Sequence, residues 1–577
     1  MEIKNMPEVM ADIAVDLQDP NRMLISGLFR ETAKDGSRER EFLTYIPENT
    51  HNGQPCIVVA MPSGSNPGEV LEKTGLKAFA DERKYLIHLV PAANNGWRLD
   101  GRDAMFLNTV YVAVNSRRYY VALQDNMFLL GLGDGADAAQ QAAKNMASEW
   151  SGLITIGDLT LDLREDHSTA MQEQDQGSGE LKIQAMRAQL PVWMFVSELS
   201  GANAGTAEYW RGENKNLPEP LSGQGADYIW MPSPVRAQSE INEEHIAEVR
   251  VTTGTTECIR QTLETAWSYI GLARRHRGIG KKFLRYNKDP LALGATLHTL
   301  EVNGMMRKWY EYVPETCTPD QSWPLVVVMH GRGGTAETFF EISCMSVVAR
   351  ERRFIAVFPE AGIYQQFQGG LRNILLWCGE YQGKPIDDIQ FIRAMVDDVR
   401  ARNKVDNGRI YACGQSSGGM MTDLLNNCAS DLFTATASWS ALRAPKRMYA
   451  DFPETKNPCP TMYIFGELDP LNASKTPDPE FPFNLTAEMK EQVLGKMKRY
   501  GLKLEDVQIW DDYPIHWAAF PNAQGVPMLV IGMVHNMAHA NYPEESGISY
   551  DQYLCGFHKD ADGALYWRGK KVIVPEQ

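Results

Sequence analysis

Short apolar runs alternate along the chain with longer segments whose apolar residues recur at helical spacing. Nearly continuous runs of Val, Ile and Leu stand in the first half as IVVAM, LIHLV and MFLLG, and in the second as LVVVM, FIAVF, RIYACG, TMYIFG and MLVIG. Runs of this kind are typical of strands buried on both faces of a parallel sheet with helical crossovers. Turn signals at 34–36 (KDG) and 302–304 (VNG) predict that each half opens with a hairpin. We therefore predict the α/β class, with a mostly parallel sheet flanked by helices in each half.

The two halves contain the same landmarks in the same order. FLTYIPE, from Phe42, and WYEYVPE, from Trp309, each precede an apolar run led by proline. Glycine-rich turns follow at 131–135 and 414–418, and later come the matching segments PVWMFVSELS and PTMYIFGELD. A long repeat of ordered landmarks predicts a tandem duplication, in which each half is one large domain.

A basic, glycine-containing stretch separates the halves, as expected of a linker. The predicted organisation is a first domain over residues 1–275, a linker over 276–290 and a second domain over 291–577. A chain of 577 residues is long enough for two such domains.

Charge and composition exclude several classes of partner. The formal net charge of −16 disfavours nucleic acid, whose phosphates attract basic surfaces, and also disfavours anionic membranes. The chain has no apolar run of about 18 residues and no apolar h-region at its start. These features predict no membrane span and, unless a leader has been trimmed, a cytoplasmic protein. The nine cysteines lack metal-ligand spacing, so we expect reduced thiols and no metal.

The strongest chemical signal is Gly-Gln-Ser-Ser-Gly at 414–418, between a predicted strand and a predicted helix. This context is typical of a nucleophile elbow, a sharp turn that holds a serine hydroxyl at a helix N-terminus. Small residues two positions before and after the serine allow strand and helix to pack closely. The candidate nucleophile is Ser416.

A serine nucleophile needs a base and an acid that orients the base. The acid is expected at the tip of a later strand, where Asp469 ends TMYIFGELD and Glu467 is an alternative. The base is expected between the last strand and the last helix, which leaves His535 and His539. Spacing alone does not choose between these two histidines.

Two backbone N–H groups are expected to bind the oxyanion of the reaction intermediate. One belongs to Ser417, directly after the nucleophile. The other comes from the glycine-rich loop at 330–334, where Arg332 is the candidate. His330 precedes the nucleophile in the chain, which is the wrong order for the base, and we interpret it as structural.

Several segments of the second half resemble one enzyme family. PLVVVMHGRGGTAETF, RFIAVFPEA, DDIQFIRAMVDDVRARNKVDNGRIYACGQSSGGMM and DLFTATASWSA are similar to the polyhydroxybutyrate depolymerase/feruloyl esterase group of α/β hydrolases, over most of 297–557. The resemblance implies an α/β-hydrolase fold with Ser416 as nucleophile and Asp469 as acid. It favours His539 as base, because family members place a His-Ala pair ahead of a terminal helix. The expected architecture is two tandem α/β-hydrolase-like domains.

The sequence departs from secreted members of this group, since it shows no leader, no disulfide framework and no polymer-binding module. A soluble acyl, hydroxyacyl-oligomer, aryl or sugar ester is therefore the expected substrate. Trp377, Trp439 and Trp517 are candidate pocket walls, and each is explained equally well as core. Tyr364 and Arg332 are candidate contacts to polar substrate groups.

The first half lacks the same chemistry. The repeat aligns Gly133 with the nucleophile and Ser200 with the acid, and no histidine occurs between 246 and 275. His245 and His276 flank that window, so the missing base is the weakest of the three points. We predict a catalytically silent domain, because glycine has no hydroxyl with which to attack.

The sequence thus predicts a serine carboxylic ester hydrolase without a metal or cofactor, acting on a small-molecule or oligomeric ester. Two alternatives stay open: an acyltransferase that uses the same triad, and a non-catalytic binding protein. A homo-oligomer is compatible with the sequence.

Overall fold

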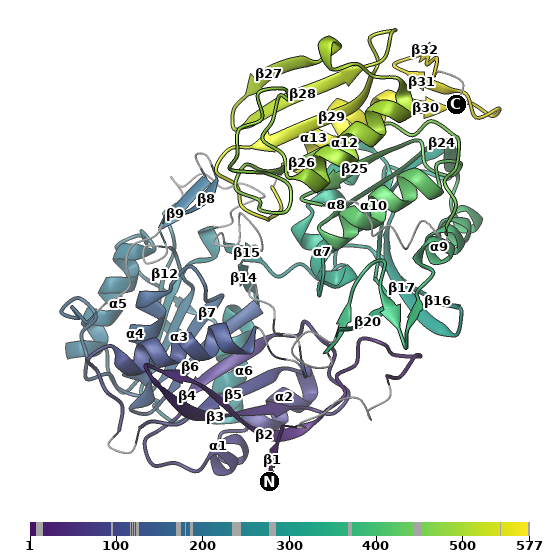
Figure 1. Ribbon diagram of the computed structural model, residues 1–577. Coiled ribbons are helices and arrows are strands. Elements are labelled where there is room, and N and C mark those ends of the chain that lie inside the picture. Colours follow the sequence, from purple (N-terminus) through teal and green to yellow (C-terminus); the bar gives the residue numbers. More distant parts are fainter. Residues whose placement is uncertain are drawn as a thin grey trace.

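The computed structural model describes residues 1–6, 15–93, 96–115, 117, 119–120, 122, 126–168, 175–178, 181–184, 188–233, 244–275, 284–366, 372–441, 452–542 and 544–574. Figure 1 shows two bodies side by side, each with a large sheet against which helices pack. The first body runs from purple through blue to teal, and the second from teal through green to yellow.

The sheet of the first body has eleven strands in the order β1-β2-β3-β5-β4-β6-β7-β10-β13-β12-β11. These strands are β1 (Ile3–Asn5), β2 (Gly27–Asp35), β3 (Arg38–Ile46), β4 (Cys56–Ala60), β5 (Leu86–Val90), β6 (Met127–Leu132), β7 (Gly152–Ile156), β10 (Val192–Val196), β11 (Leu221–Gly223), β12 (Ala226–Trp230) and β13 (Val249–Thr253). The central strands from β5 to β13 run parallel, and the predicted hairpin is β2–β3.

The sheet of the second body has ten strands in the order β16-β17-β19-β18-β24-β25-β26-β29-β28-β27. These strands are β16 (Thr296–Val302), β17 (Met305–Tyr312), β18 (Trp323–Met329), β19 (Ile355–Pro359), β24 (Val405–Gln415), β25 (Ala435–Trp439), β26 (Thr461–Gly466), β27 (Gln508–Asp512), β28 (Ile515–Pro521) and β29 (Pro527–Val534). When β1 is set aside and strands are matched in chain order, the two sheets have the same strand order.

Helices of the first body are α1 (Pro67–Lys73), α2 (Leu76–Arg83), α3 (Arg102–Val114), α4 (Gly135–Asn145), α5 (Gly201–Glu213) and α6 (Arg260–Ile270). Those of the second are α7 (Ala336–Ile342), α8 (Met345–Arg352), α9 (Asp388–Arg402), α10 (Ser417–Cys428), α12 (Ala487–Tyr500) and α13 (Glu545–Ile548). They bury both faces of each sheet. In β18, Val326 and Val328 belong to one apolar cluster, whereas Leu325 and Val327 belong to another. This alternation explains why the strand is apolar at every position.

The two bodies contact each other through a hairpin and through an early segment of the chain. The hairpin pairs β14 (Ala273–Arg275) with β15 (Leu284–Tyr286), so part of the predicted linker is a strand. Two buried arginines of this hairpin, Arg274 and Arg285, approach Glu341 of α7 to 4.0 and 3.7 Å. Val15 packs into an apolar cluster of the second body.

Among the residues described, no helix combines the length and the apolar character needed to cross a bilayer. Within the same ranges, no group of three His, Cys, Asp or Glu side chains is placed to hold a metal ion.

Candidate active site

Ser416 lies in a sharp turn between β24 and α10, as the motif predicts. Its φ of 54° and ψ of −114° are strained for a residue with a side chain, and its N–H donates to Trp439 O at 2.9 Å. The flanking glycines are required by close packing. A Cβ on Gly418 would lie 2.1 Å from Met329 O, and one on Gly414 would lie 2.7 Å from the backbone of Gly418. The backbone therefore holds the Ser416 hydroxyl at the N-terminus of α10.

Three predicted residues from distant parts of the chain meet at this turn. Nε2 of His539 lies 3.0 Å from Ser416 Oγ, and Nδ1 of the same ring lies 3.0 Å from Asp469 Oδ2. The His539 side chain is 29% exposed, whereas that of Asp469 is fully buried. The imidazole is thus partly exposed to solvent, whereas the carboxylate that it contacts is shielded from water.

The carboxylate of Asp469 is held in place by its own loop. Leu471 N–H donates to Oδ1 at 3.0 Å, and Asn472 Nδ2 donates to Oδ2 at 2.8 Å. Burial raises the pKa of Asp469, but the hydrogen bonds and charge of His539, with those of Leu471 and Asn472, bring the pKa below its usual value. The group is therefore ionised at neutral pH. Asn472 was missed by the sequence reasoning, although an amide three residues after the acid was visible.

The alternative acid and the alternative base pair with each other. Glu467 Oε2 lies 2.7 Å from His535 Nδ1 and accepts the N–H of Asn536 at 3.1 Å. Their side chains are 41% and 50% exposed. The candidate acids and bases of the sequence thus form two carboxylate–imidazole pairs. Of these, the pair of Asp469 and His539 contacts Ser416.

The glycine-rich loop after β18 lies directly against the nucleophile. A Cβ on Gly331 would lie 3.4 Å from Ser416 Cβ. The carbonyl of Gly331 accepts the N–H of Gly334 at 3.1 Å and lies 2.7 Å from His330 Nδ1. The Gly331 carbonyl and the Arg332 N–H belong to one trans peptide and point in opposite directions. Contacts that fix the carbonyl therefore also fix the direction of the Arg332 N–H. The buried His330 also accepts the N–H of Ala361 at Nε2, 3.0 Å away, which is a structural role.

The first body repeats the turn without the hydroxyl. Gly133 has a φ of 55°, and its N–H donates to Ile156 O at 2.9 Å, as that of Ser416 does to Trp439 O. Asp134 follows Gly133, and its carboxylate accepts the N–H of Ser63 at 2.8 Å. Ser63 lies in the loop after β4, the strand that matches β18. The backbone N–H of Ser63, in the loop that corresponds to 330–334, is therefore already hydrogen-bonded to the Asp134 carboxylate.

The acid and base positions of the first body carry no triad chemistry. Ser200 follows β10 as Asp469 follows β26, and its hydroxyl donates to Glu198 at 2.7 Å. The described segment 254–259, between β13 and α6, contains no histidine. His245 precedes β13 and contacts the Tyr286 ring, and His276 lies outside the described residues.

The tryptophans expected as pocket walls are packed inside the second body. Trp377, Trp439 and Trp517 are 0%, 0% and 1% exposed. Trp439 Nε1 donates to Ser549 Oγ at 3.0 Å, and Trp517 packs on Gly532, where a Cβ would meet its ring at 2.5 Å. With no ring face exposed, all three act as core residues in this structure. The Tyr364 side chain lies outside the described part of the chain.

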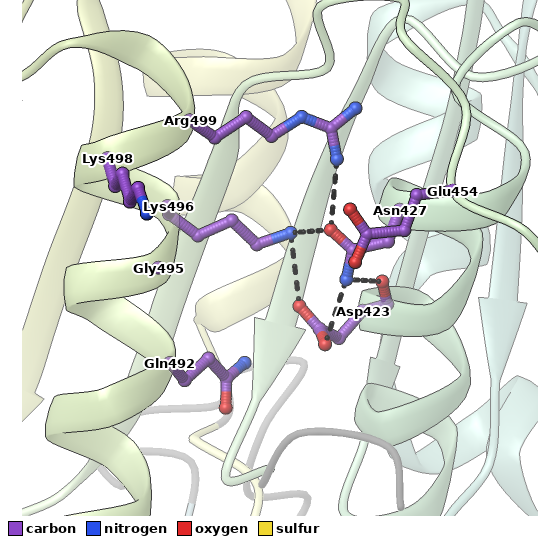
Figure 2. Close-up of a pocket in the computed structure, with 8 residues that line it drawn as sticks. All are labelled: Asp423, Asn427, Glu454, Gln492, Gly495, Lys496, Lys498 and Arg499. Carbon is purple, nitrogen blue, oxygen red and sulfur yellow. Dashed lines mark hydrogen bonds and ion pairs between the residues drawn. The ribbon is translucent and has the colours of Figure 1, made fainter. Parts of the chain in front are cut away.

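A separate cavity of about 410 Å³ lies between α10 and α12 (Figure 2). Its lining comprises Asp423, Asn427, Glu454, Gln492, Gly495, Lys496, Lys498 and Arg499. Lys496 points at Asp423 and Asn427, with Nζ 3.3 Å and 2.6 Å from their oxygens. Burial lowers the pKa of Lys496, and the Asp423 carboxylate opposes that shift. Asp423 lies about two helical turns, or roughly 10 Å, along α10 from Ser416, so the cavity is distinct from the triad.

Known proteins that resemble the chain are named as esterases or as a depolymerase. No family model matches the chain. It is 31% identical over 149 residues to the putative esterase NocK of Nocardia uniformis subsp. tsuyamanensis, covering 26% of this chain and 40% of the relative. It is 32% identical over 133 residues to feruloyl esterase B of Thermothelomyces thermophilus, covering 23% and 43%. It is 30% identical over 119 residues to poly(3-hydroxyalkanoate) depolymerase C of Paucimonas lemoignei, covering 20% and 27%. The chain spans less than half the length of each relative.

Among solved structures, an acetyl xylan esterase from Aspergillus awamori aligns with 45% of this chain and 99% of its own, at 14% identity and a TM-score of 0.33.

Proposed function

We propose that the chain is a serine carboxylic ester hydrolase whose triad is Ser416, His539 and Asp469. The observation that carries the proposal is the continuous relay of contacts, 3.0 Å from hydroxyl to imidazole and 3.0 Å from imidazole to carboxylate. The names of the relatives support an ester as substrate. A soluble acyl, hydroxyacyl-oligomer, aryl or sugar ester remains our proposal for its class.

Each residue of the relay has a distinct task. His539 Nε2 takes the proton of Ser416 as the hydroxyl attacks the ester carbonyl, and then gives that proton to the leaving alcohol. Ionised Asp469 holds the Nδ1–H tautomer and stabilises the imidazolium that forms. Water activated by the same imidazole then hydrolyses the acyl-enzyme.

The proposed oxyanion donors are the backbone N–H groups of Ser417 and Arg332. Ser417 is the first residue of α10, where the helix dipole favours negative charge. The Arg332 amide is supported by the anchoring of the neighbouring Gly331 carbonyl, described above. Fixed donors of this kind stabilise charge without having to reorganise during the reaction.

We also propose that residues 1–275 form a degenerate, non-catalytic copy of the second domain, joined to 291–577 by the linker 276–290. The shared strand order and the matching backbone at Gly133 and Ser416 support a tandem duplication. Gly133 lacks a hydroxyl, and Asp134 occupies an amide of the adjacent loop. Both features make this domain silent toward esters.

Variants of the triad test the proposal against p-nitrophenyl acyl esters, methyl ferulate and hydroxybutyrate oligomers. Ser416→Ala and His539→Ala should each lower kcat by about 10⁴-fold or more, because triad residues act as a unit. Ser417→Ala is the matched control, since it keeps the backbone N–H and should leave kcat within about threefold of the native value. Full activity in Ser416→Ala would refute the proposed function.

A further inference from the structure

The exposed pair of Glu467 and His535 lies beside the triad in both sequence and space. Glu467 stands two residues before the acid Asp469, at the end of β26. His535 stands four residues before the base His539, at the end of β29. The pair therefore joins the two loops that carry the acid and the base.

A single carboxylate oxygen makes this connection at two points. Glu467 Oε2 contacts His535 Nδ1 at 2.7 Å and accepts the N–H of Asn536 at 3.1 Å. The next residue, Leu468, donates its N–H to Met537 O at 2.8 Å. Three consecutive residues of the base loop, 535–537, are thus fixed to the acid strand before the chain reaches His539.

The base loop packs directly on the end of β26, so its position is tightly restricted. A Cβ on Gly466 would lie 2.0 Å from Met537 O and 2.7 Å from Ala538 O. Only a glycine at the strand end lets the loop come this close. A loop fixed at 535–537 and packed on Gly466 sets where residue 539 emerges, and a displacement of about 1 Å at a reacting group can cost on the order of 100-fold in rate.

The first body offers an internal comparison. Glu198 occupies the place of Glu467, two residues before Ser200, but there its carboxylate accepts the Ser200 hydroxyl at 2.7 Å. In the domain that lacks the catalytic histidine, the equivalent carboxylate makes a contact within its own loop. The connection between loops accompanies the triad, and the shared fold alone does not account for it.

We propose that Glu467 and His535 are positioning residues, which hold the 535–539 loop so that His539 Nε2 meets Ser416 Oγ. This inference rests on the proposed function of the triad. The pair does not touch the reacting atoms. It acts through the loop, and its loss is expected to slow acylation while leaving substrate binding intact.

The test compares Glu467→Ala, Glu467→Gln and His535→Ala with the native protein. A fluorophosphonate probe reports acylation of Ser416, and steady-state kinetics separate kcat from KM. Glu467→Ala and His535→Ala should each lower the labelling rate and kcat by about 10-fold with KM unchanged. Glu467→Gln keeps one acceptor oxygen and should lose about threefold, a partial rescue.

The matched control is the pair of Asp511 and His516, another carboxylate–imidazole contact, which joins the neighbouring strands β27 and β28 instead of the acid and base loops. Asp511→Asn should label at the native rate. Melting temperatures are measured for every variant, and labelling is done well below the lowest of them, so that only folded protein is compared.

The possible failures are distinguishable. If the fluorophosphonate probe labels Ser416→Ala, the proposed function itself is wrong. If the native protein labels and Ser416→Ala does not, but Glu467→Ala labels at the native rate, the positioning role alone is wrong. A lowered melting temperature with native labelling in Glu467→Ala would likewise reduce the pair to a structural contact.

Discussion

Glu341 is a buried carboxylate at the boundary between the two bodies, and its replacement tests what joins them. The residue is 8% exposed, and Arg274 of the first body and Arg285 of the linker hairpin approach it to 4.0 and 3.7 Å. These arginines are themselves 6% and 1% exposed. Glu341→Gln removes the charge and leaves two buried guanidinium groups without this anion. Breaking a buried pair by removing one partner typically costs about 3–5 kcal/mol, and we expect a loss of stability in that range.

A double-mutant cycle is needed, because a single variant shows how much stability is lost but not which interaction caused the loss. Arg274→Met with Arg285→Met removes both cations, keeps much of the side-chain volume and should also cost about 3–5 kcal/mol, since Glu341 is then left buried without them. The triple variant removes all three charges together. Its cost should fall well below the sum of the other two, with a coupling energy of about 3 kcal/mol.

Urea unfolding followed by circular dichroism measures these free energies, with esterase activity as a second probe of the same transition. Glu351→Gln on α8 is the control, because Glu351 is 48% exposed and pairs with Arg352 at the surface. A surface pair of this kind is worth about 0–1 kcal/mol. If the costs of Glu341→Gln and of the double arginine variant simply add in the triple variant, the carboxylate and the arginines are not coupled and the reasoning fails.

Two further predictions concern the proposed silent domain and the pH dependence of stability. Gly133→Ser in a Ser416→Ala background should give no detectable esterase activity, because the new hydroxyl has no base or acid and Asp134 occupies the nearby amide; measurable turnover would contradict the silent assignment. Burial raises the pKa of Glu545 to about 8, so unfolding releases a proton at neutral pH. The free energy of unfolding should therefore fall as the pH rises from about 4.3, the usual value for the carboxyl in an unfolded chain, to about 8. Urea unfolding across this range should show a weaker fall in Glu545→Gln, and equal slopes would contradict the assignment to this residue.

The sheets could be predicted because their signal is local. A strand covered on both faces must be apolar at every position, and β18 shows this directly, with Leu325 and Val327 facing one cluster and Val326 and Val328 the other. The same holds for Ser416, whose turn needs glycines within two residues on either side. Backbone geometry of this kind leaves its mark within a few positions of the sequence.

Spacing could not choose between His535 and His539 because the answer depends on contacts between loops. Both histidines follow β29, and each pairs with a carboxylate that follows β26: His535 with Glu467, and His539 with Asp469. Which histidine reaches Ser416 depends on how deeply each part of the loop lies in the fold. Its start stays at the surface, where His535 is half exposed, and it then passes over Gly466 toward the buried Asp469. No periodicity encodes that path.

The tryptophans show a second limit of the sequence. An aromatic residue gains a similar free energy from burial against core side chains as from burial against a substrate, so residue type alone does not separate the two. Trp439 lies one strand from the nucleophile, and its backbone carbonyl even accepts the N–H of Ser416. Its ring nevertheless points to Ser549 and is fully buried. A backbone next to the nucleophile therefore does not imply a side chain that reaches the site.

In the proposed first domain, the positions that would carry a triad and the contacts with the second body belong to different parts of the fold. Gly133 and Ser200 lie at the carboxyl ends of β6 and β10, where a triad would assemble. Arg274 and Arg285 lie on the β14–β15 hairpin, after the last strand of the sheet. Substitutions at the strand ends can therefore remove catalysis without disturbing the ion pairs with Glu341. A domain in this position can lack catalysis and still matter for stability, because the buried Glu341 of the second body faces Arg274 of the first body and Arg285 of the linker hairpin.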